Sequence, residues 1–219
     1  MKAIIIFAKY PEPHKVKTRL GAQIGHTLAA DLYRIFIEQT IALAAACSAD
    51  RIFIAYEPKE HASEFQKILP VGVATFPQDG IDLGKRLLNA FQWTFSQGAS
   101  RVVIIGSDSP TLPPQFIGSA FDSLQYSDIV IGPAVDGGYY LIGSKTAHPQ
   151  LFENIEWSST SVLEKTLERA SELRLTYSLL SKWYDVDEIE SLRRAVKDDP
   201  TGHIKNFLFK HSTPQLAQK

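Results

Sequence analysis

Acidic and basic side chains directly follow apolar segments of the chain, where they could bind an anion together with a metal ion. Lys17 and Arg19 come after the apolar run Ala3–Ala8, and Asp108 comes after the apolar run Arg101–Gly106. In open α/β sheets, ligands bind beyond the carboxyl ends of the strands. Lysine and arginine can neutralise a diphosphate, and a carboxylate in such a place needs a cation. The residues therefore predict metal or phosphate chemistry at one edge of a sheet.

A second acidic pair strengthens the metal hypothesis. Asp185 and Asp187 stand two residues apart, where a strand is expected to end and a helix to begin, so an extended backbone would point both to one side. Carboxylates from separate loops suit Mg²⁺ or Mn²⁺ when the ion also holds a diphosphate. Asp108 and Asp187 could instead cap helices, but Thr111 is better placed to cap the helix expected near Pro113, and the nearby basic loop favours metal binding.

Asp136 lies between two apolar segments and is followed by Gly137 and Gly138. The glycines allow a tight turn and leave room for a ligand to approach the backbone. An ordinary turn explains this pattern as well as a functional site does. As a functional residue, Asp136 would act as a base on an acceptor hydroxyl.

The composition narrows the class of protein. The 219 residues are 44% hydrophobic with a formal net charge of −1, which predicts one domain over residues 1–219, a frayed tail at 212–219, and no nucleic-acid or membrane partner. The chain has no apolar run of the roughly 18 residues that a membrane span needs and no signal-peptide pattern at its start, so we expect a cytoplasmic protein. The six histidines lack metal-ligand spacing, and Ser107 and Ser109 lack an evident histidine base, which disfavours zinc and serine-hydrolase chemistry.

Short apolar runs alternate with longer helical patterns. Strands are expected at Ala3–Ala8, Arg51–Tyr56, Val71–Phe76, Arg101–Gly106, Asp128–Ala134, Gly138–Gly143 and Leu175–Leu180. Helices are expected at Gly25–Ala46, Glu60–Leu69, Asp82–Phe95, Pro113–Leu124, Ser159–Leu173 and Glu188–Val196. This alternation predicts an α/β fold with a mostly parallel sheet, covered by helices on both faces. The short connection at Asp136 requires a sharp turn, so the sheet should be mixed, with at least one antiparallel strand.

Five segments together resemble a known superfamily. They are FAKYPEPHKVKTRLG, QDGIDLGKRL, GSDSPTLPP, GPAVDGGYYLIG and WYDVDEIESL, and they run from Phe7 to Leu192. In this order they resemble small bacterial glycosyltransferase-like proteins of the nucleotide-diphospho-sugar transferase superfamily. This group is known as the arsenosugar-biosynthesis or radical-SAM-associated glycosyltransferases and is similar to molybdenum-cofactor guanylyltransferases. The resemblance implies a GT-A type, Rossmann-like three-layer sandwich, a nucleotide donor, and Mg²⁺ or Mn²⁺.

The resemblance also implies roles for individual residues. Asp108 and Asp187 would bind the metal ion, Lys17 and Arg19 the phosphates, and Asp136 would meet the acceptor. The remaining nucleotide-binding positions would be Ala8, Lys9, Gln78, Gly80 and Gly84. The chain departs from the pattern at two places, since its first loop lacks the GxGxR sequence of sugar nucleotidyltransferases and its central strand is followed by SDSP rather than Asp-x-Asp.

Three functions follow as hypotheses. The first is metal-dependent transfer of a sugar from a nucleoside diphosphate sugar to a small-molecule acceptor. The second is nucleotidyl transfer from a nucleoside triphosphate, with release of pyrophosphate. The third is a catalytically inactive nucleotide-binding protein. The sequence does not identify the base, the sugar, the acceptor or the oligomeric state.

Overall fold

The computed structural model describes residues 1–70 and 73–211, and these form an α/β fold around one seven-stranded sheet. The strands are β1 Lys2–Lys9, β2 Arg51–Glu57, β3 Ala74–Pro77, β4 Arg101–Gly106, β5 Ile129–Pro133, β6 Tyr139–Ser144 and β7 Tyr177–Leu179. Each lies in or overlaps a segment predicted as a strand. The expected start of β3 at Val71 falls outside the described residues, and so does the predicted frayed tail at 212–219.

The sheet is mixed and mostly parallel, as predicted. Its strand order is β3-β2-β1-β4-β6-β5-β7, and only β6 runs antiparallel to its neighbours. The connection between β5 and β6 is the sharp turn expected at Asp136. The chain leaves β1 toward β2 on one side and later returns to β4 on the other, so β1 and β4 form the topological switch point, where ligands bind in such sheets.

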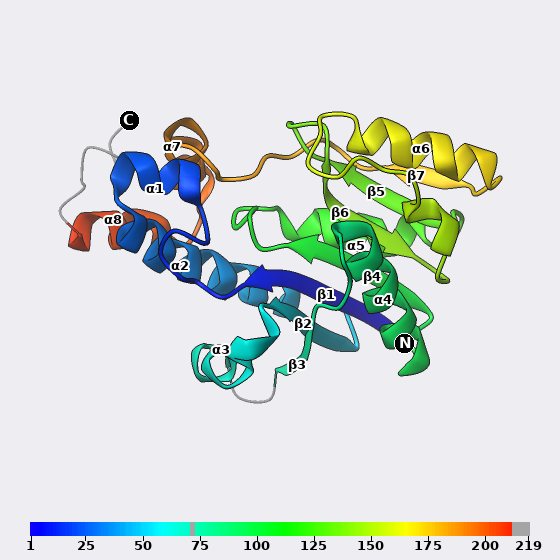
Figure 1. Cartoon of the computed structure of the whole chain (residues 1–219), viewed down its shortest axis with the longest axis horizontal. Coiled ribbons are helices and arrows are strands. Elements are labelled where there is room, and N and C mark those ends of the chain that lie inside the picture. Colours follow the sequence, from blue (N-terminus) through cyan, green and yellow to red (C-terminus); the bar gives the residue numbers. More distant parts are fainter. Residues whose placement is uncertain (71–72, 212–219) are drawn as a thin grey trace.

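Helices cover both faces of the sheet (Figure 1). They are α1 Thr18–Ile24, α2 His26–Ala45, α3 Ala62–Ile68, α4 Leu83–Ser96, α5 Pro114–Ser123, α6 Val162–Glu172, α7 Ile189–Asp198 and α8 His203–Lys210, with 3₁₀ turns η1 Lys59–His61 and η2 Pro149–Phe152. Residues of α4, α6 and η2 pack into the core on one face, and residues of α1, α2, α3, α5, α7 and α8 pack on the other. The result is the predicted three-layer arrangement.

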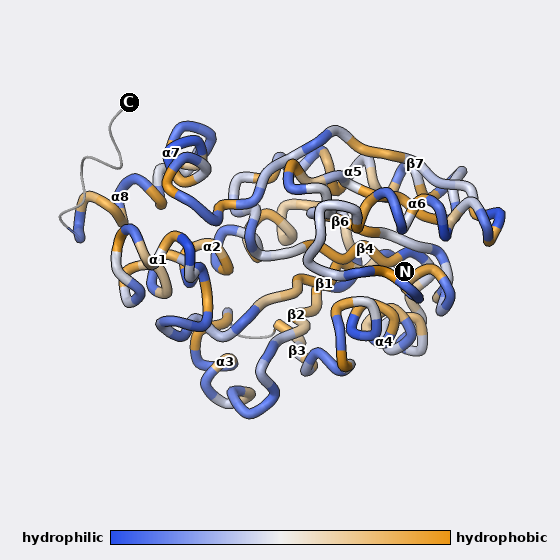
Figure 2. The backbone as a smooth tube through the Cα atoms, turned by 45° about the horizontal axis from the view of Figure 1, so that its top comes forward, coloured by the Kyte–Doolittle hydropathy of each residue, from blue (hydrophilic) through white to orange (hydrophobic). Residues whose placement is uncertain are grey.

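The alternation of side chains along β1 explains why the sheet carries two cores. Ile4 and Ile6 face the core that includes Phe36 of α2, whereas Ile5 faces the core that includes Phe91 of α4. Because both faces are covered, the central strands are apolar throughout, and the hydrophobic colouring follows β1 and β4 through the interior (Figure 2). Within the described residues, no helix has the length and apolar character to cross a membrane.

Three details differ from the sequence-based expectations. The segment around Lys17 and Arg19 is not only a loop, because α1 begins at Thr18. The helix α8 was not predicted at all. Thr111 does not cap α5, whose N-cap is Pro113; the Thr111 hydroxyl instead lies 3.1 Å from the hydroxyl of Tyr184.

The buried carboxylate of Asp199 ties the start of α8 to α2. It accepts hydrogen bonds from the Thr201 hydroxyl at 2.6 Å, from the Ile204 backbone N–H at 2.9 Å and from the Gln39 amide at 3.0 Å. Burial alone would raise the pKa of Asp199, but these hydrogen bonds outweigh it, the Thr201 hydroxyl most strongly, and lower the pKa below its usual value.

We expect Asp199→Asn to lower the free energy of unfolding by about 1–3 kcal/mol at pH 7, because buried donors lose a charged acceptor. The pKa of Asp199 is lower in the folded state, so its contribution is complete above about pH 4 and is lost as the pH falls through the folded pKa. Urea denaturation at several pH values tests this. The difference from wild type should shrink below about pH 4, and the exposed Asp122→Asn serves as the control.

Candidate functional site

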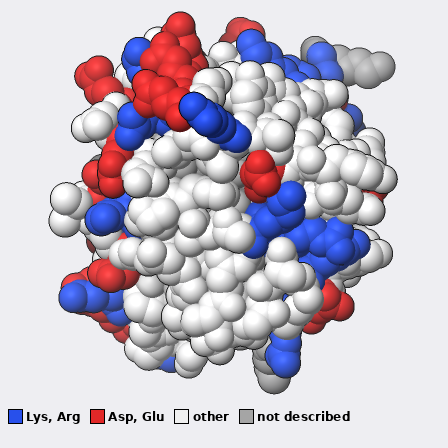
Figure 3. Space-filling model, turned by 90° about the vertical axis from the view of Figure 1, so that its right-hand side faces the viewer, with Lys and Arg blue, Asp and Glu red and all other residues white. Residues whose placement is uncertain are grey.

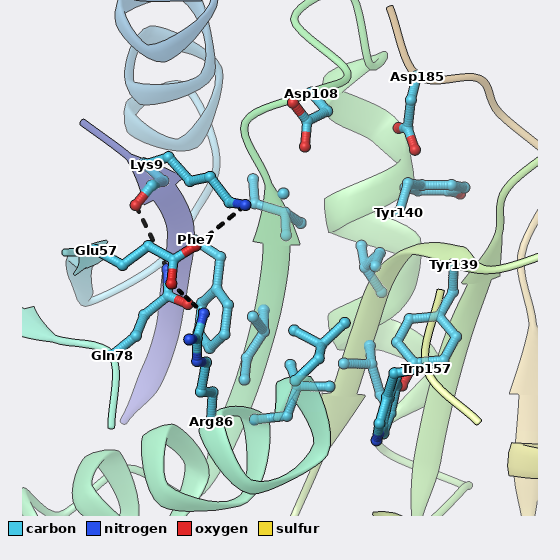
Figure 4. A pocket seen from close by; sticks show the side chains of 18 of the residues that line it. Phe7, Lys9, Glu57, Gln78, Arg86, Asp108, Tyr139, Tyr140, Trp157 and Asp185 are labelled. Atoms are coloured by element: carbon cyan, nitrogen blue, oxygen red, sulfur yellow. Dashed lines mark hydrogen bonds and ion pairs between the residues drawn. The ribbon is translucent and has the colours of Figure 1, made fainter. Parts of the chain in front are cut away.

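A cavity of about 540 Å³ opens at the carboxyl ends of the parallel strands, beside the switch point between β1 and β4. Figure 4 shows two opposite walls. The charged wall consists of Lys9, Glu57, Gln78 and Arg86, and the aromatic wall consists of Tyr139, Tyr140 and Trp157. Asp108 and Asp185 lie between the two walls at one end of the cavity. The short β5–β6 turn makes the aromatic wall possible, because antiparallel β6 begins at the edge where the parallel strands end.

Lys17 joins the two aspartates that were predicted to bind a metal ion. Its Nζ atom lies 2.5 Å from Oδ1 of Asp108 and 2.9 Å from Oδ1 of Asp187. The Lys17 side chain is only 2% exposed, whereas those of Asp108 and Asp187 are 47% and 50% exposed. Asp108 and Asp187 lie 91 and 170 positions after Lys17 in the sequence, and both contact its ammonium group.

The surroundings of Lys17 hold its ammonium group in this position. The backbone of Lys17 is left-handed, with φ of 46°, a conformation that a non-glycine residue keeps only when its surroundings impose it. Its Nζ lies 5.6 Å and 5.8 Å from the ring centres of Tyr33 and Phe36. Burial would lower the pKa of Lys17, but the negative charges of Asp108 and then Asp187 raise it, so the ammonium stays protonated.

Asp187 is free to meet Lys17 because another residue caps α7. Glu188 is the N-cap of α7 and forms a capping box with Ser191. The capping role considered for Asp187 in the sequence is therefore wrong. Asp185 also points toward this region, and its Oδ1 accepts a hydrogen bond from the Ser109 hydroxyl at 2.5 Å. Burial, followed by the charge of Asp108, raises the pKa of Asp185 to about 6.

The charged wall is organised around Glu57, at the end of β2. Its carboxylate forms an ion pair with Arg86 of α4 and lies 3.3 Å from Nζ of Lys9. Gln78 is fixed by its amide group, which donates to the carbonyl of Ala55 at 2.9 Å and to that of Ala8 at 3.4 Å. Because these two hydrogen bonds use the NH₂ group of Gln78, its side-chain oxygen remains available as an acceptor.

Basic residues line a smaller cavity of about 250 Å³ next to the aspartates. Its cations are Lys9, Lys15, Lys17 and Arg19. Arg19 is 75% exposed, and its guanidinium lies 3.6 Å from the carboxylate of Glu188, so it remains accessible to an anion. The end of the molecule shown in Figure 3 carries both signs of charge, with broad uncharged areas between them.

Three predicted site residues line neither the main cavity nor the smaller cavity beside the aspartates. Gly80 accepts a hydrogen bond from Arg86 through its carbonyl, and Gly84 packs so closely on Trp157 that a Cβ atom there would lie 2.6 Å from the indole. Asp136 is exposed, and its carboxylate accepts a hydrogen bond from the N–H of Gly138 at 2.9 Å, which closes its own turn. The two glycines thus shape the walls of the site, and Asp136 stabilises the turn before β6.

Tyr33 is a site residue that sequence reasoning missed. Its hydroxyl lies 2.6 Å from the Ser107 hydroxyl and accepts a hydrogen bond from the N–H of Lys9 at 3.1 Å. Ser107 in turn donates to the carbonyl of Phe7 at 3.0 Å. Burial raises the pKa of Tyr33, so its hydroxyl stays protonated. Through these bonds α2 fixes the ends of β1 and β4 relative to each other.

Comparison with solved structures finds close similarity to a protein of Desulfovibrio desulfuricans G20, provisionally assigned as a nucleotide-diphospho-sugar transferase. The two chains are 36% identical, with a TM-score of 0.86 over 98% of this chain and 93% of the other. The comparison supports the predicted fold, that of nucleotide-sugar transferases.

More distant structures share the fold alone. One is CMP:2-keto-3-deoxy-manno-octonic acid synthetase in complex with CTP, 11% identical with a TM-score of 0.57, covering 89% of this chain and 96% of that chain. Another is Rv0371c from Mycobacterium tuberculosis H37Rv in complex with manganese, 15% identical with a TM-score of 0.51, covering 88% of this chain and 96% of that chain.

No curated protein matches the chain. A family model matches residues 40–159, which is more than half of the chain and contains Glu57, Gln78 and Asp108. That family is described as "Uncharacterized protein conserved in bacteria (DUF2064)", and the chain belongs to it.

Proposed function

We propose that the protein is a metal-dependent glycosyltransferase that moves a sugar from a nucleoside diphosphate sugar to a small acceptor. The observation that carries this proposal is the meeting of Asp108, Asp187 and Lys17 at the edge of a large cavity beside the switch point. The similarity to the D. desulfuricans protein supports the choice of a nucleoside diphosphate sugar as the donor.

The residues present fit a divalent cation. Two carboxylates already converge on one positive charge, the Lys17 ammonium, and both are about half exposed. No cluster of three or more potential metal-ligating side chains occurs among residues 1–70 and 73–211, which agrees with an ion that takes its other ligands from substrate phosphates and water. When bound by Asp108 and Asp187, Mg²⁺ or Mn²⁺ would offset the charge that develops on the leaving diphosphate.

The two walls suit the two substrates. In our proposal the nucleoside lies along the charged wall, near Ala8, Lys9 and Gln78, and Lys17 and Arg19 neutralise its phosphates. The acceptor lies against the aromatic wall. Among the acidic residues that line the cavity, Glu57 is paired with Arg86, Asp108 is paired with Lys17, and Asp82 caps α4. Within the described residues, the Asp185 carboxylate has no salt bridge and accepts a hydrogen bond from the Ser109 hydroxyl. Asp185 is therefore better placed than Asp136 to accept the acceptor's proton.

Removal of the metal tests this function directly. Purified protein treated with EDTA should lose transfer from a panel of nucleoside diphosphate sugars, and Mn²⁺ or Mg²⁺ should restore it. Product formation is measured by release of the nucleoside diphosphate in the presence of mixed acceptors. Full transfer in EDTA would contradict the proposal.

Nucleotidyl transfer is the second candidate function, favoured by the four cations around the smaller cavity, which would suit the higher charge of a triphosphate. In that case pyrophosphate appears only when a nucleoside triphosphate and a phosphorylated acceptor are both present. The two reactions are separated by the leaving group, a nucleoside diphosphate in one and pyrophosphate in the other. The first proposal includes membership of the arsenosugar-biosynthesis or radical-SAM-associated group of glycosyltransferases.

A further inference from the structure

The ammonium group of Lys17 lies where the two predicted metal ligands converge. It contacts one oxygen of Asp108 at 2.5 Å and one of Asp187 at 2.9 Å, and its side chain is almost completely buried. These contacts give Lys17 a role in addition to phosphate binding, because the chain itself supplies a positive charge to the carboxylates.

Lys17 has little freedom to leave this position. Its left-handed backbone is fixed at the start of α1, and its ammonium lies near the rings of Tyr33 and Phe36 on α2. An approaching divalent cation therefore meets an existing positive charge on a side chain that is almost completely buried. Like charges at close range oppose binding most strongly where solvent screening is weak.

An approaching anion meets the opposite difficulty. Asp108 and Asp187 repel a diphosphate that arrives alone and already occupy the Lys17 ammonium, although Lys15 and Arg19 on the same cavity attract it. A metal ion and a diphosphate that arrive together remove both conflicts, since the carboxylates gain the metal ion and Lys17 gains a phosphate oxygen. The metal ion thus neutralises the carboxylates that repel the diphosphate, and the diphosphate neutralises the ammonium that repels the metal ion.

We propose that this site binds a divalent cation and a diphosphate group as one unit, and that Lys17 makes each ligand depend on the other. The proposal rests on the proposed function, because it uses the same site. It assigns the ligand as a metal–diphosphate complex rather than a free metal ion followed by a nucleotide. By thermodynamic linkage, the diphosphate must raise the affinity for the metal by the same factor as the metal raises that for the diphosphate.

Binding measurements on the wild-type protein provide the first test. Mn²⁺ binding is followed by electron paramagnetic resonance of the free ion, with and without a nucleoside diphosphate, and diphosphate binding is followed by calorimetry with Mn²⁺ or with EDTA, each corrected for the complex in solution. We expect each ligand to bind at least about tenfold more tightly when the other is present. Equal affinity for Mn²⁺ with and without the diphosphate would overturn the proposal.

Two variants then separate Lys17 from the other cations. Lys17→Met should bind Mn²⁺ alone about tenfold or more tightly than wild type, whereas it should lose affinity for the Mn²⁺–diphosphate complex. Lys67→Met is the matched control, because it makes the same substitution at an exposed position of α3 outside both cavities and should leave binding of Mn²⁺ alone unchanged. Unchanged binding of Mn²⁺ alone to folded Lys17→Met would also overturn the proposal. If that variant does not fold, the wild-type measurements decide.

The outcomes distinguish this inference from the proposed function. Coupled binding of Mn²⁺ and a diphosphate without any sugar transfer would reject the transferase and keep the inference. Metal-dependent transfer with tight binding of Mn²⁺ alone would keep the transferase and reject the inference. Inorganic pyrophosphate, used in place of the nucleotide, shows whether the diphosphate group alone is sufficient for coupling.

Discussion

Asp108→Asn is expected to reduce kcat/KM of the metal-dependent transfer by about 10³-fold, because it removes one of the two carboxylates that would hold the metal ion. Loss of a metal's electrostatic stabilisation costs several kcal/mol in the transition state, and each 1.4 kcal/mol corresponds to about a tenfold change in rate. The asparagine has nearly the same shape as aspartate, so the cavity should be preserved. Steady-state kinetics over a range of Mn²⁺ concentrations measures the effect.

The control for this variant is Asp31→Asn, which makes the same change in charge at an exposed position of α2. It should retain the activity of wild type. Thermal unfolding of both variants shows whether they are folded under the assay conditions. Wild-type activity in folded Asp108→Asn would remove Asp108 from the metal site and leave the charge cluster with a structural role only.

Gly137→Ala is expected to lower the free energy of unfolding by about 2–5 kcal/mol, which combines the cost of overpacking with that of a left-handed alanine. Gly137 has φ of 95°, and a Cβ atom there would lie 2.1 Å from the carbonyl oxygen of Thr160. That oxygen belongs to the backbone of the segment that follows Trp157 and Ser158. The clash should therefore displace the neighbouring part of the aromatic wall as well as destabilise the fold.

Gly98→Ala is a matched control for the backbone cost. Gly98 has a similar φ of 87°, but a Cβ atom there would have no neighbour within 4 Å. Its substitution should cost only about 1–2 kcal/mol, as expected for one left-handed residue. The difference between the two variants in urea denaturation isolates the steric conflict with Thr160. Equal destabilisation would show that the turn accommodates a side chain by moving.

The sheet was largely predictable because buried parallel strands leave a strong sequence signal. The run Ala3–Ala8 is apolar throughout because both faces of β1 are covered, and β2 and β4 follow the same rule. The antiparallel β6 was predictable for a different reason. The connection at Asp136 is too short for a helical crossover, so the direction of the chain had to reverse.

The contacts within the site were less accessible to sequence reasoning. The types and positions of Lys17, Asp108 and Asp187 indicated an anion and a metal ion, but the sequence does not show that the lysine contacts both aspartates. That contact depends on the left-handed backbone of Lys17 and on the packing of α2 against β1, which are tertiary features. The short α1 was hidden for a related reason, because it begins within the basic segment and its few apolar residues give little periodicity.

Glu57 could have been found by wider use of the rule that selected Lys17 and Asp108, namely that ligands bind beyond the carboxyl ends of the strands. It ends β2 at the same edge of the sheet, and its pairing with Arg86 forms the centre of the charged wall. Tyr33 carried no comparable signal. It lies within a long apolar helix, where an aromatic residue is usually part of the core, and only the fold brings its hydroxyl to Ser107.

The position of Trp157 in the cavity wall allows its intrinsic fluorescence to report ligand binding. The chain has three tryptophans, and Trp157 lines both the main cavity and a neighbouring cavity of about 270 Å³, whereas Trp93 and Trp183 line neither. Indole emission responds to the polarity of its surroundings. A variant with Trp93→Phe and Trp183→Phe would therefore carry a single emitter in the wall of the cavity, and stopped-flow fluorescence could follow the arrival of each ligand in real time without a label.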